Sequence, residues 1–263
     1  MINTTLYFLN QNPVTLYTFV FLYAICAGSF LNVVIYRLPI ILNRKWSLMC
    51  NEFLSLPHKE TPPFSLLLPR STCPHCQKQI KAWHNIPLLS YLFLKGRCGF
   101  CQKSISFRYP FIELATGVLS VLVVYYFGLT LQGACALVFL DFLIALAFID
   151  IDTQLLPDEL TIPLIWLGLL CNTQALFTSL TDAVISAAGA YLALWIFVKL
   201  FLLMTKKEGM GGGDLKLFAA LGAWLGSKML PLIILSSSLI GAIIGVTILR
   251  CTKQGRDTPL PFG

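Results

Sequence analysis

Charged side chains are scarce in this sequence, and one long stretch has none. Only 12% of the 263 residues are Asp, Glu, Lys or Arg, whereas 57% are hydrophobic, and residues 1–36 carry no charged side chain. Soluble globular domains have about twice this charged fraction, so the composition excludes an ordinary water-soluble protein. The balance indicates a polytopic membrane protein, in which lipid covers most of the surface.

Other absences narrow the fold class further. The first apolar run lacks the small-residue cleavage site of a removed signal peptide, and it is long enough to remain as a transmembrane helix. The apolar runs are continuous and do not alternate with polar residues, which disfavours a β-barrel. No inverted repeat typical of many transporters is visible.

The apolar segments predict an all-α polytopic membrane protein with about seven transmembrane helices, because only helices or closed barrels satisfy their backbone in lipid. The sequence ends in an apolar, proline-containing stretch, "TPLPFG". This stretch resembles the start of one more span, so we expect an eighth helix to be missing at the C-terminus. The predicted spans are about 14–36, 110–127, 131–149, 160–171, 182–204, 215–226 and 230–249.

Basic residues concentrate in one segment. Residues 37–108 hold eleven of the nineteen Lys and Arg residues and only two acids. The positive-inside rule places this segment in the cytoplasm, where contact with acidic lipid is the expected use of its charge and a nucleic-acid partner is not expected. We therefore expect a first transmembrane helix at 1–36, a cytoplasmic domain at 37–108 and a membrane-embedded domain at 109–263.

Four of the nine cysteines form two CxxC pairs that are separated by twenty-one residues. This spacing predicts a tetrahedral zinc site with four thiolate ligands, Cys73, Cys76, Cys98 and Cys101. Four thiolates leave no open position for substrate, so the zinc is expected to stabilise a small domain. The alternative is redox dithiols or disulfides, which a reducing cytoplasm disfavours.

Two carboxylates at span ends are the candidate catalytic pair. Counting alternate crossings from a cytoplasmic 37–108 segment places Asp150 and Asp214 at the same membrane face. Two nearby carboxyls do not both ionise readily, so one can activate water while the other protonates the leaving amine. Asp152 is the alternative to Asp150, and Asp152 and Asp158 are otherwise expected as supporting residues. Glu113 is expected either to support a second site or to pair with Arg108, five residues earlier.

A glycine-rich stretch directly precedes Asp214 in the sequence. It comprises Gly209, Gly211, Gly212 and Gly213. Without side chains, these residues would let a substrate backbone lie against the loop, and they permit positive φ. A flexible connector is the alternative interpretation. Lys216 is expected either to stabilise the Asp214 carboxylate or to contact lipid phosphate.

Five motifs in order resemble the type IV prepilin peptidases, which are bifunctional leader peptidases and N-methyltransferases. They are GSFLNVVIYRLP at 28–39, the paired CxxC motifs, RYPFIELATG at 108–117, DIDTQLLPD at 150–158 and GGGD at 211–214. The resemblance covers nearly the whole chain. It implies a membrane aspartic endopeptidase whose peptidase domain is 109–263 and whose catalytic residues are Asp150 and Asp214.

The resemblance also implies substrates and a methyl donor. The chain would cut the basic leader from type IV prepilins or type II secretion pseudopilins after a Gly, at the cytoplasmic face of the bacterial inner membrane. It would then methylate the new N-terminus with S-adenosylmethionine, although no Rossmann-type pattern is visible. The alternatives are a transporter that uses the acids as a proton relay and a non-enzymatic, zinc-bearing membrane scaffold.

Overall fold

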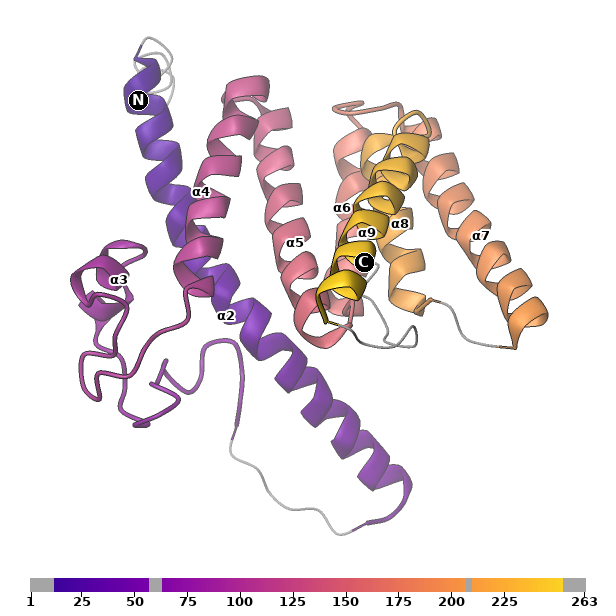
Figure 1. Ribbon diagram of the computed structural model, residues 1–263. Helices are drawn as coiled ribbons and strands as arrows, with labels where there is room; N and C mark the ends of the chain where they lie inside the picture. The colour runs from indigo at the N-terminus through magenta and orange to yellow at the C-terminus, as the bar shows by residue number, and fades with distance from the viewer. Residues whose placement is uncertain (1–11, 57–62, 207–209, 253–263) are drawn as a thin grey trace. The chain divides into compact units, whose positions relative to one another are not determined.

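The structure is a computed structural model that describes residues 12–56, 63–206 and 210–252 (Figure 1). In this part of the chain every regular element is a helix, and β pairing is limited to two isolated bridges. The predicted all-α fold is therefore confirmed. The helices are α2 (Pro13–Phe53), η1 (Ala82–Asn85), α3 (Leu89–Phe93), α4 (Arg108–Phe127), α5 (Leu131–Thr153), α6 (Asp158–Asn172), α7 (Leu180–Thr205), α8 (Gly212–Leu225) and α9 (Leu230–Thr252).

Each predicted span coincides with one of these helices. Among the described residues, α2, α4, α5 and α7 are long and apolar enough to cross a membrane. The helices α6 and α8 have 15 and 14 residues, which agrees with the two short segments expected from the sequence. These helices identify the chain as a membrane protein.

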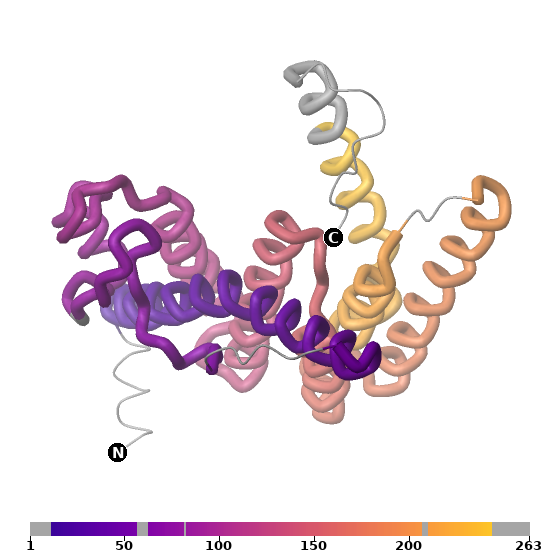
Figure 2. Tube along the Cα trace, turned by 90° about the horizontal axis from the view of Figure 1, so that it is seen from below, coloured from indigo at the N-terminus to yellow at the C-terminus, as the bar shows by residue number. Residues whose placement is uncertain are grey.

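The first helix is much longer than predicted. The apolar run ends near residue 36, but α2 continues to Phe53 and spans 41 residues as one rod (Figure 2). Its length is about 60 Å, twice the thickness of a hydrocarbon core. No sequence signal indicated this continuation, because basic residues can mark the end of a membrane span without ending the helix, and even Pro39 lies within the helix.

The chain divides into two compact units, Met1–Phe148 and Ile149–Gly263. In the first unit, α2 and α4 pack closely because each helix has a glycine where it meets the other. A Cβ atom on Gly28 would lie 2.9 Å from the Glu113 Cα atom, and one on Gly117 would lie 2.6 Å from the Phe21 ring. Small residues at such contacts allow membrane helices to pack backbone to backbone.

In the second unit, α8 packs between α6 and α7. A Cβ atom on Gly168 of α6 would lie 2.5 Å from the Trp224 ring, and one on Gly222 would lie 2.7 Å from the Ser186 carbonyl of α7. The Trp224 indole also donates a 2.8 Å hydrogen bond to the Leu164 carbonyl. These contacts fix α8, whose first turn carries Asp214, against its neighbours.

A buried amide joins the end of α6 to the end of α8. The Asn172 side chain, 0% exposed, donates to the carbonyl groups of Ala223 and Trp224 at 2.8 and 3.1 Å. Its Oδ1 atom accepts hydrogen bonds from the amides of Phe177 and Thr178 at 3.0 and 3.1 Å. One side chain therefore satisfies four backbone groups.

Replacing Asn172 with leucine should destabilise the second unit strongly. The substitution leaves buried backbone groups without partners, and each such group costs about 1–3 kcal/mol. We expect the melting temperature of the purified protein in detergent to fall by several degrees. Thr173→Ala is the matched control, because the Thr173 hydroxyl is exposed and bonds the nearby Leu170 carbonyl of α6. Equal melting temperatures for Asn172→Leu and the control would contradict this account.

Candidate functional site

The second unit holds both predicted catalytic aspartates. Asp150 lies near the C-terminal end of α5 and is only 5% exposed, whereas Asp152, two residues further on, is exposed. A buried carboxylate is far costlier than a solvated one and is usually functional. Burial therefore favours Asp150 over the alternative Asp152.

Asp214 occupies the first turn of α8 and is partly buried. At this position the positive end of the helix dipole favours a negative charge. The negative charge of Asp150 acts electrostatically on Asp214, although the two residues come from different helices. The two aspartates named from the sequence therefore lie within electrostatic range of each other, and their catalytic role stays a prediction.

Two contacts join the segment that follows Asp150 to the first turns of α8, which carry Asp214. A Cβ atom on Gly213 would lie 2.7 Å from the Leu156 Cβ atom and 3.1 Å from the Leu156 carbonyl oxygen. Three residues further along α8, the Lys216 ammonium group binds both carboxylate oxygens of Asp158, at 2.6 and 2.7 Å. The segment that follows Asp150 therefore packs against the segment that carries Asp214.

The glycine-rich stretch differs from expectation in its backbone. Gly211 has a φ of −74°, and Gly212 and Gly213 already belong to α8, so positive φ is not the reason for glycine at these positions. Gly213 is needed for the close approach of Leu156. A Cβ atom on Gly212 would meet nothing within 4 Å, so this residue leaves open space beside the site. Gly209 lies outside the described residues.

Lys216, near the start of α8, has a partner that the sequence did not suggest. Lys216 was expected to act on Asp214 or on lipid phosphate, but its ammonium group forms an ion pair with Asp158. Asp158 is in the first turn of α6, fifty-eight positions away along the chain. A contact between residues this far apart depends on helix packing, which no local sequence pattern reports.

The four predicted cysteines form a cluster in the first unit. The four Sγ atoms all lie within 4.8 Å of one another, so this group could hold a metal ion. The cysteines are Cys73, Cys76, Cys98 and Cys101. The Cys73 and Cys101 sulfurs are 3.8 Å apart. Thiolates that bind one tetrahedral zinc at about 2.3 Å are about 3.8 Å apart, so the cluster fits zinc.

The backbone around the first pair also suits a metal-bound thiolate. Hydrogen bonds from the backbone of Cys76 and His75 lower the pKa of the Cys73 thiol to about 6. A metal binds the deprotonated form, so the backbone favours the ligand state at Cys73. At Cys101 a backbone hydrogen bond from Lys103 acts in the same direction, but burial and the neighbouring thiols raise its pKa to about 11, so this thiol would lose its proton only when a metal binds. The Cys73 amide in turn bonds the Lys78 carbonyl, and the Cys98 amide bonds the Lys103 carbonyl, so the two knuckles have matching backbone folds.

Glu113 is buried in the first unit, where it belongs to α4. Its carboxylate accepts a 2.8 Å hydrogen bond from the amide of Leu88, the residue that precedes α3. The sequence suggested a supporting role for Glu113 but gave no indication of this partner. The contact joins the metal-binding segment to a membrane helix.

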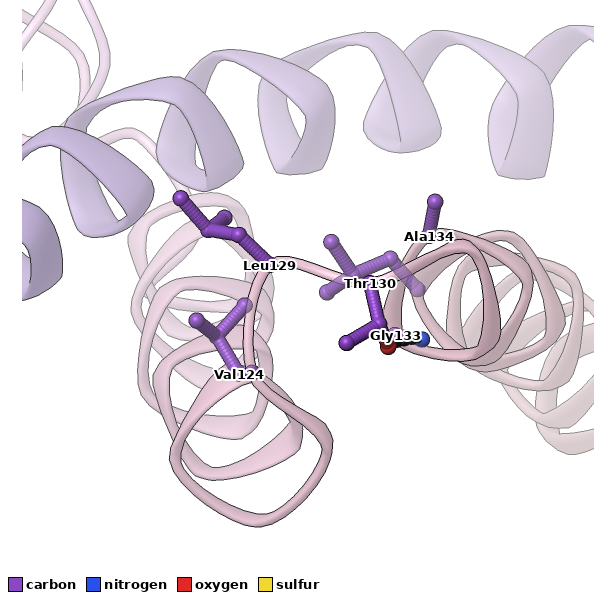
Figure 3. Close-up of a pocket in the computed structure, with 7 residues that line it drawn as sticks. Val124, Leu129, Thr130, Gly133 and Ala134 are labelled. Atoms are coloured by element: carbon purple, nitrogen blue, oxygen red, sulfur yellow. Dashed lines mark hydrogen bonds between the residues drawn. The ribbon is translucent and has the colours of Figure 1, made fainter. Parts of the chain in front are cut away.

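A pocket lies at the turn between α4 and α5 (Figure 3). It has a volume of about 240 Å³ and is lined by Val124, Gly128, Leu129, Thr130, Gly133, Ala134 and Leu137. None of these side chains can ionise. The pocket therefore differs in chemistry from both the aspartate pair and the cysteine cluster.

Comparison with known proteins places the chain in a family. Residues 22–127 match the bacterial peptidase A24 N-terminal domain, and residues 137–246 match the type IV leader peptidase family. No solved structure gives a significant match.

Curated relatives cover the chain almost completely. A protein from Legionella pneumophila is 54% identical over 95% of this chain and 88% of its own length, and one from Stutzerimonas stutzeri is 50% identical over 99% and 90%. A protein from Pseudomonas aeruginosa is 48% identical over 97% and 89%. All three are named prepilin leader peptidase/N-methyltransferase. The chain is therefore an enzyme and belongs to the type IV leader peptidase family.

Proposed function

We propose that this enzyme removes the leader peptide from type IV prepilins or type II secretion pseudopilins, with Asp150 and Asp214 as its acid–base pair. The observation that carries the proposal is that the segment after Asp150 packs against the start of α8, where Leu156 contacts Gly213. This packing brings Asp214 within electrostatic range of Asp150, which is buried near the end of α5. The names of the relatives supply the substrate class. The site itself supplies the groups that hydrolysis needs.

The chemistry requires the two carboxyl groups to hold one proton between them. The ionised carboxylate removes a proton from a water molecule, whose oxygen attacks the carbonyl carbon of the scissile peptide bond. The protonated carboxyl donates to the carbonyl oxygen, and the carbon–nitrogen bond then breaks as the leaving amine takes a proton. The proton belongs to the pair as a unit, so neither residue alone is named the acid.

The open side of the glycine-rich stretch suits the approach of an extended substrate. Gly211 and Gly212 are exposed, and Gly212 has no neighbour in the direction of a side chain. A substrate backbone can therefore come close to the first turn of α8 beside Asp214. Lys216 of α8 forms an ion pair with Asp158 of α6, and this ion pair holds the starts of the two helices together at the proposed site.

We place this site at the cytoplasmic face of a bacterial inner membrane. Support comes from the positive-inside rule, because residues 37–108 carry eleven basic residues and no comparable cluster occurs elsewhere in the sequence. A prepilin leader is basic, and the exposed acids Asp152 and Glu159 near the proposed site would attract it. The apolar segment after the leader would remain in the membrane.

Methylation of the new N-terminus is the second proposed activity, and it is supported by the names of the relatives. S-adenosylmethionine would supply the methyl group to the free amine. The pocket between α4 and α5 does not fit this donor, because its lining has no charged side chain for a molecule that carries ammonium, carboxylate and sulfonium groups. No catalytic step is assigned through the donor.

The metal that we propose for the cysteine cluster is zinc. Cys73, Cys76, Cys98 and Cys101 would bind it, and four thiolates would leave it no open position. A bound zinc would therefore cross-link the two knuckles and act structurally. The short segment around the cluster has little apolar core, which makes such a cross-link valuable for its stability.

The proposed activities can be read in one assay. Membranes that contain the enzyme are incubated with a full-length prepilin and S-adenosylmethionine, and the product is measured by mass spectrometry. We expect loss of the leader followed by the gain of one methyl group at the new N-terminus. An unchanged prepilin mass, with normal pilin processing in cells that lack this chain, would favour a scaffold or a transporter and contradict the proposal.

A further inference from the structure

The metal-binding segment exposes large apolar side chains beside the membrane helices. In η1, Trp83 is 64% exposed, and in α3, Leu92 and Phe93 are 70% and 82% exposed. A soluble domain rarely gathers such residues in a short segment without a partner. We call the residues Trp83, Leu89, Leu92 and Phe93 the α3 surface.

A hydrogen bond to Glu113 fixes the position of the start of α3 along the axis of α4. This residue lies five positions after the start of α4, which is about 7.5 Å along the helix axis. The 2.8 Å hydrogen bond from the Leu88 amide to the Glu113 carboxylate places the start of α3 at that level. Figure 1 shows α3 level with the Arg108 end of α4, rather than beyond it. If α4 crosses a membrane with its Arg108 end at one surface, the start of α3 lies near the level where lipid head groups meet acyl chains.

The charge of the same segment identifies the chemistry of its partner. Residues 63–107 contain six basic residues and no acidic one. Such a segment attracts anionic head groups, and it repels a basic prepilin leader. The basic residues are Arg70, Lys78, Lys81, Lys95, Arg97 and Lys103.

Lysines flank the apolar groups as they do in interfacial anchors. The Lys81 ammonium group lies 5.7 Å from the Trp83 ring, and those of Lys78 and Lys81 lie 5.4 and 5.8 Å from the Phe100 ring. Long basic side chains can reach phosphate groups while their neighbouring apolar groups enter lipid.

We propose that the α3 surface inserts into an acidic bilayer surface, so that the metal-binding domain lies on the membrane instead of standing free in the cytoplasm. Apolar burial of Leu89, Leu92 and Phe93 and attraction of the basic residues of the same segment to anionic lipid drive this docking. The inference goes beyond the proposed function and does not depend on it, since it requires only a protein whose α4 crosses the membrane.

A tryptophan placed on the α3 surface reports its surroundings. Phe93→Trp is compared with Phe53→Trp, at the far end of α2, where the native Phe is 88% exposed and lies sixteen residues beyond Arg37. Sixteen helical residues extend about 24 Å, so Phe53 is expected to stand in water. Each protein is reconstituted in vesicles of neutral or anionic lipid. The added emission is the fluorescence of the introduced tryptophan, and it is obtained by subtracting the fluorescence of the unsubstituted protein from that of the variant.

We expect chain-brominated lipid to quench the added emission of Phe93→Trp, and acrylamide to quench it about threefold less than that of Phe53→Trp. Quenching by brominated lipid should be stronger in anionic vesicles. Equal acrylamide quenching of the two variants, with no effect of brominated lipid, would overturn the proposal. Shielding that appears only when a prepilin is added would also overturn it, because the surface would then bind substrate. Neither result would bear on cleavage.

Discussion

Asp214→Asn and Asp150→Asn should each lower prepilin cleavage by at least about 10³-fold, because general acid–base catalysis contributes factors of this size and each variant removes half of the pair. Asparagine is nearly isosteric with aspartate, so the protein should remain in the membrane at normal levels. The measurement is the initial rate of leader loss from a purified prepilin at saturating substrate.

Asp152→Asn is the matched control, because Asp152 lies on the same helix as Asp150 but is exposed. At saturating substrate it should cleave at close to the normal rate, because the attraction of the leader by Asp152 affects substrate capture and not the chemical step. Methylation of a pilin whose leader has already been removed should survive in Asp150→Asn and Asp214→Asn. Cleavage at the normal rate by either of these two variants would end the assignment of the pair.

Replacing Cys73 and Cys98 with serine should abolish stoichiometric zinc binding. One ligand is lost from each knuckle, and the remaining sulfurs, Cys76 and Cys101, cannot complete a tetrahedral thiolate site. We expect the purified double variant to contain less than about one tenth of the normal zinc. Hydrogen exchange in residues 70–106 should become much faster, because the cross-link between the knuckles is gone.

Cys50→Ser provides the control for this experiment, since Cys50 is exposed on α2 and outside the cluster. Its zinc content and exchange rates should match those of the unsubstituted protein. One zinc per chain in the Cys73→Ser/Cys98→Ser variant would refute the four-cysteine site. Slow exchange without zinc would instead show that the domain does not need a metal.

The sequence predicted the parts of this protein whose signals are local or strongly constrained by lipid. Continuous apolar runs predict helices because a backbone in lipid has no other partner than itself, and the predicted spans coincide with helices on this basis. The CxxC pairs likewise predict their own proximity, because each knuckle brings its two sulfurs together in one turn. The length of α2 was missed because charge marks the end of a span and not of a helix.

Contacts between distant segments could not be predicted in the same way. The approach of Leu156 to Gly213, the ion pair between Lys216 and Asp158 and the bond from Leu88 to Glu113 all depend on how helices pack. A glycine in a sequence can serve a turn, a flexible link or a close approach, and only the neighbours show which. At Gly213 the reason is the close approach.

The four hydrogen bonds of Asn172 constrain the order in which the second unit can be completed during synthesis. Its two acceptors, Ala223 and Trp224, are translated more than fifty residues later. When the hairpin of α6 and α7 first leaves the ribosome, this amide has not yet met those carbonyls, and the hairpin is unfinished. The arrival of α8 therefore completes the hydrogen bonds of Asn172, and Asp214 in the first turn of α8 can take its place only then.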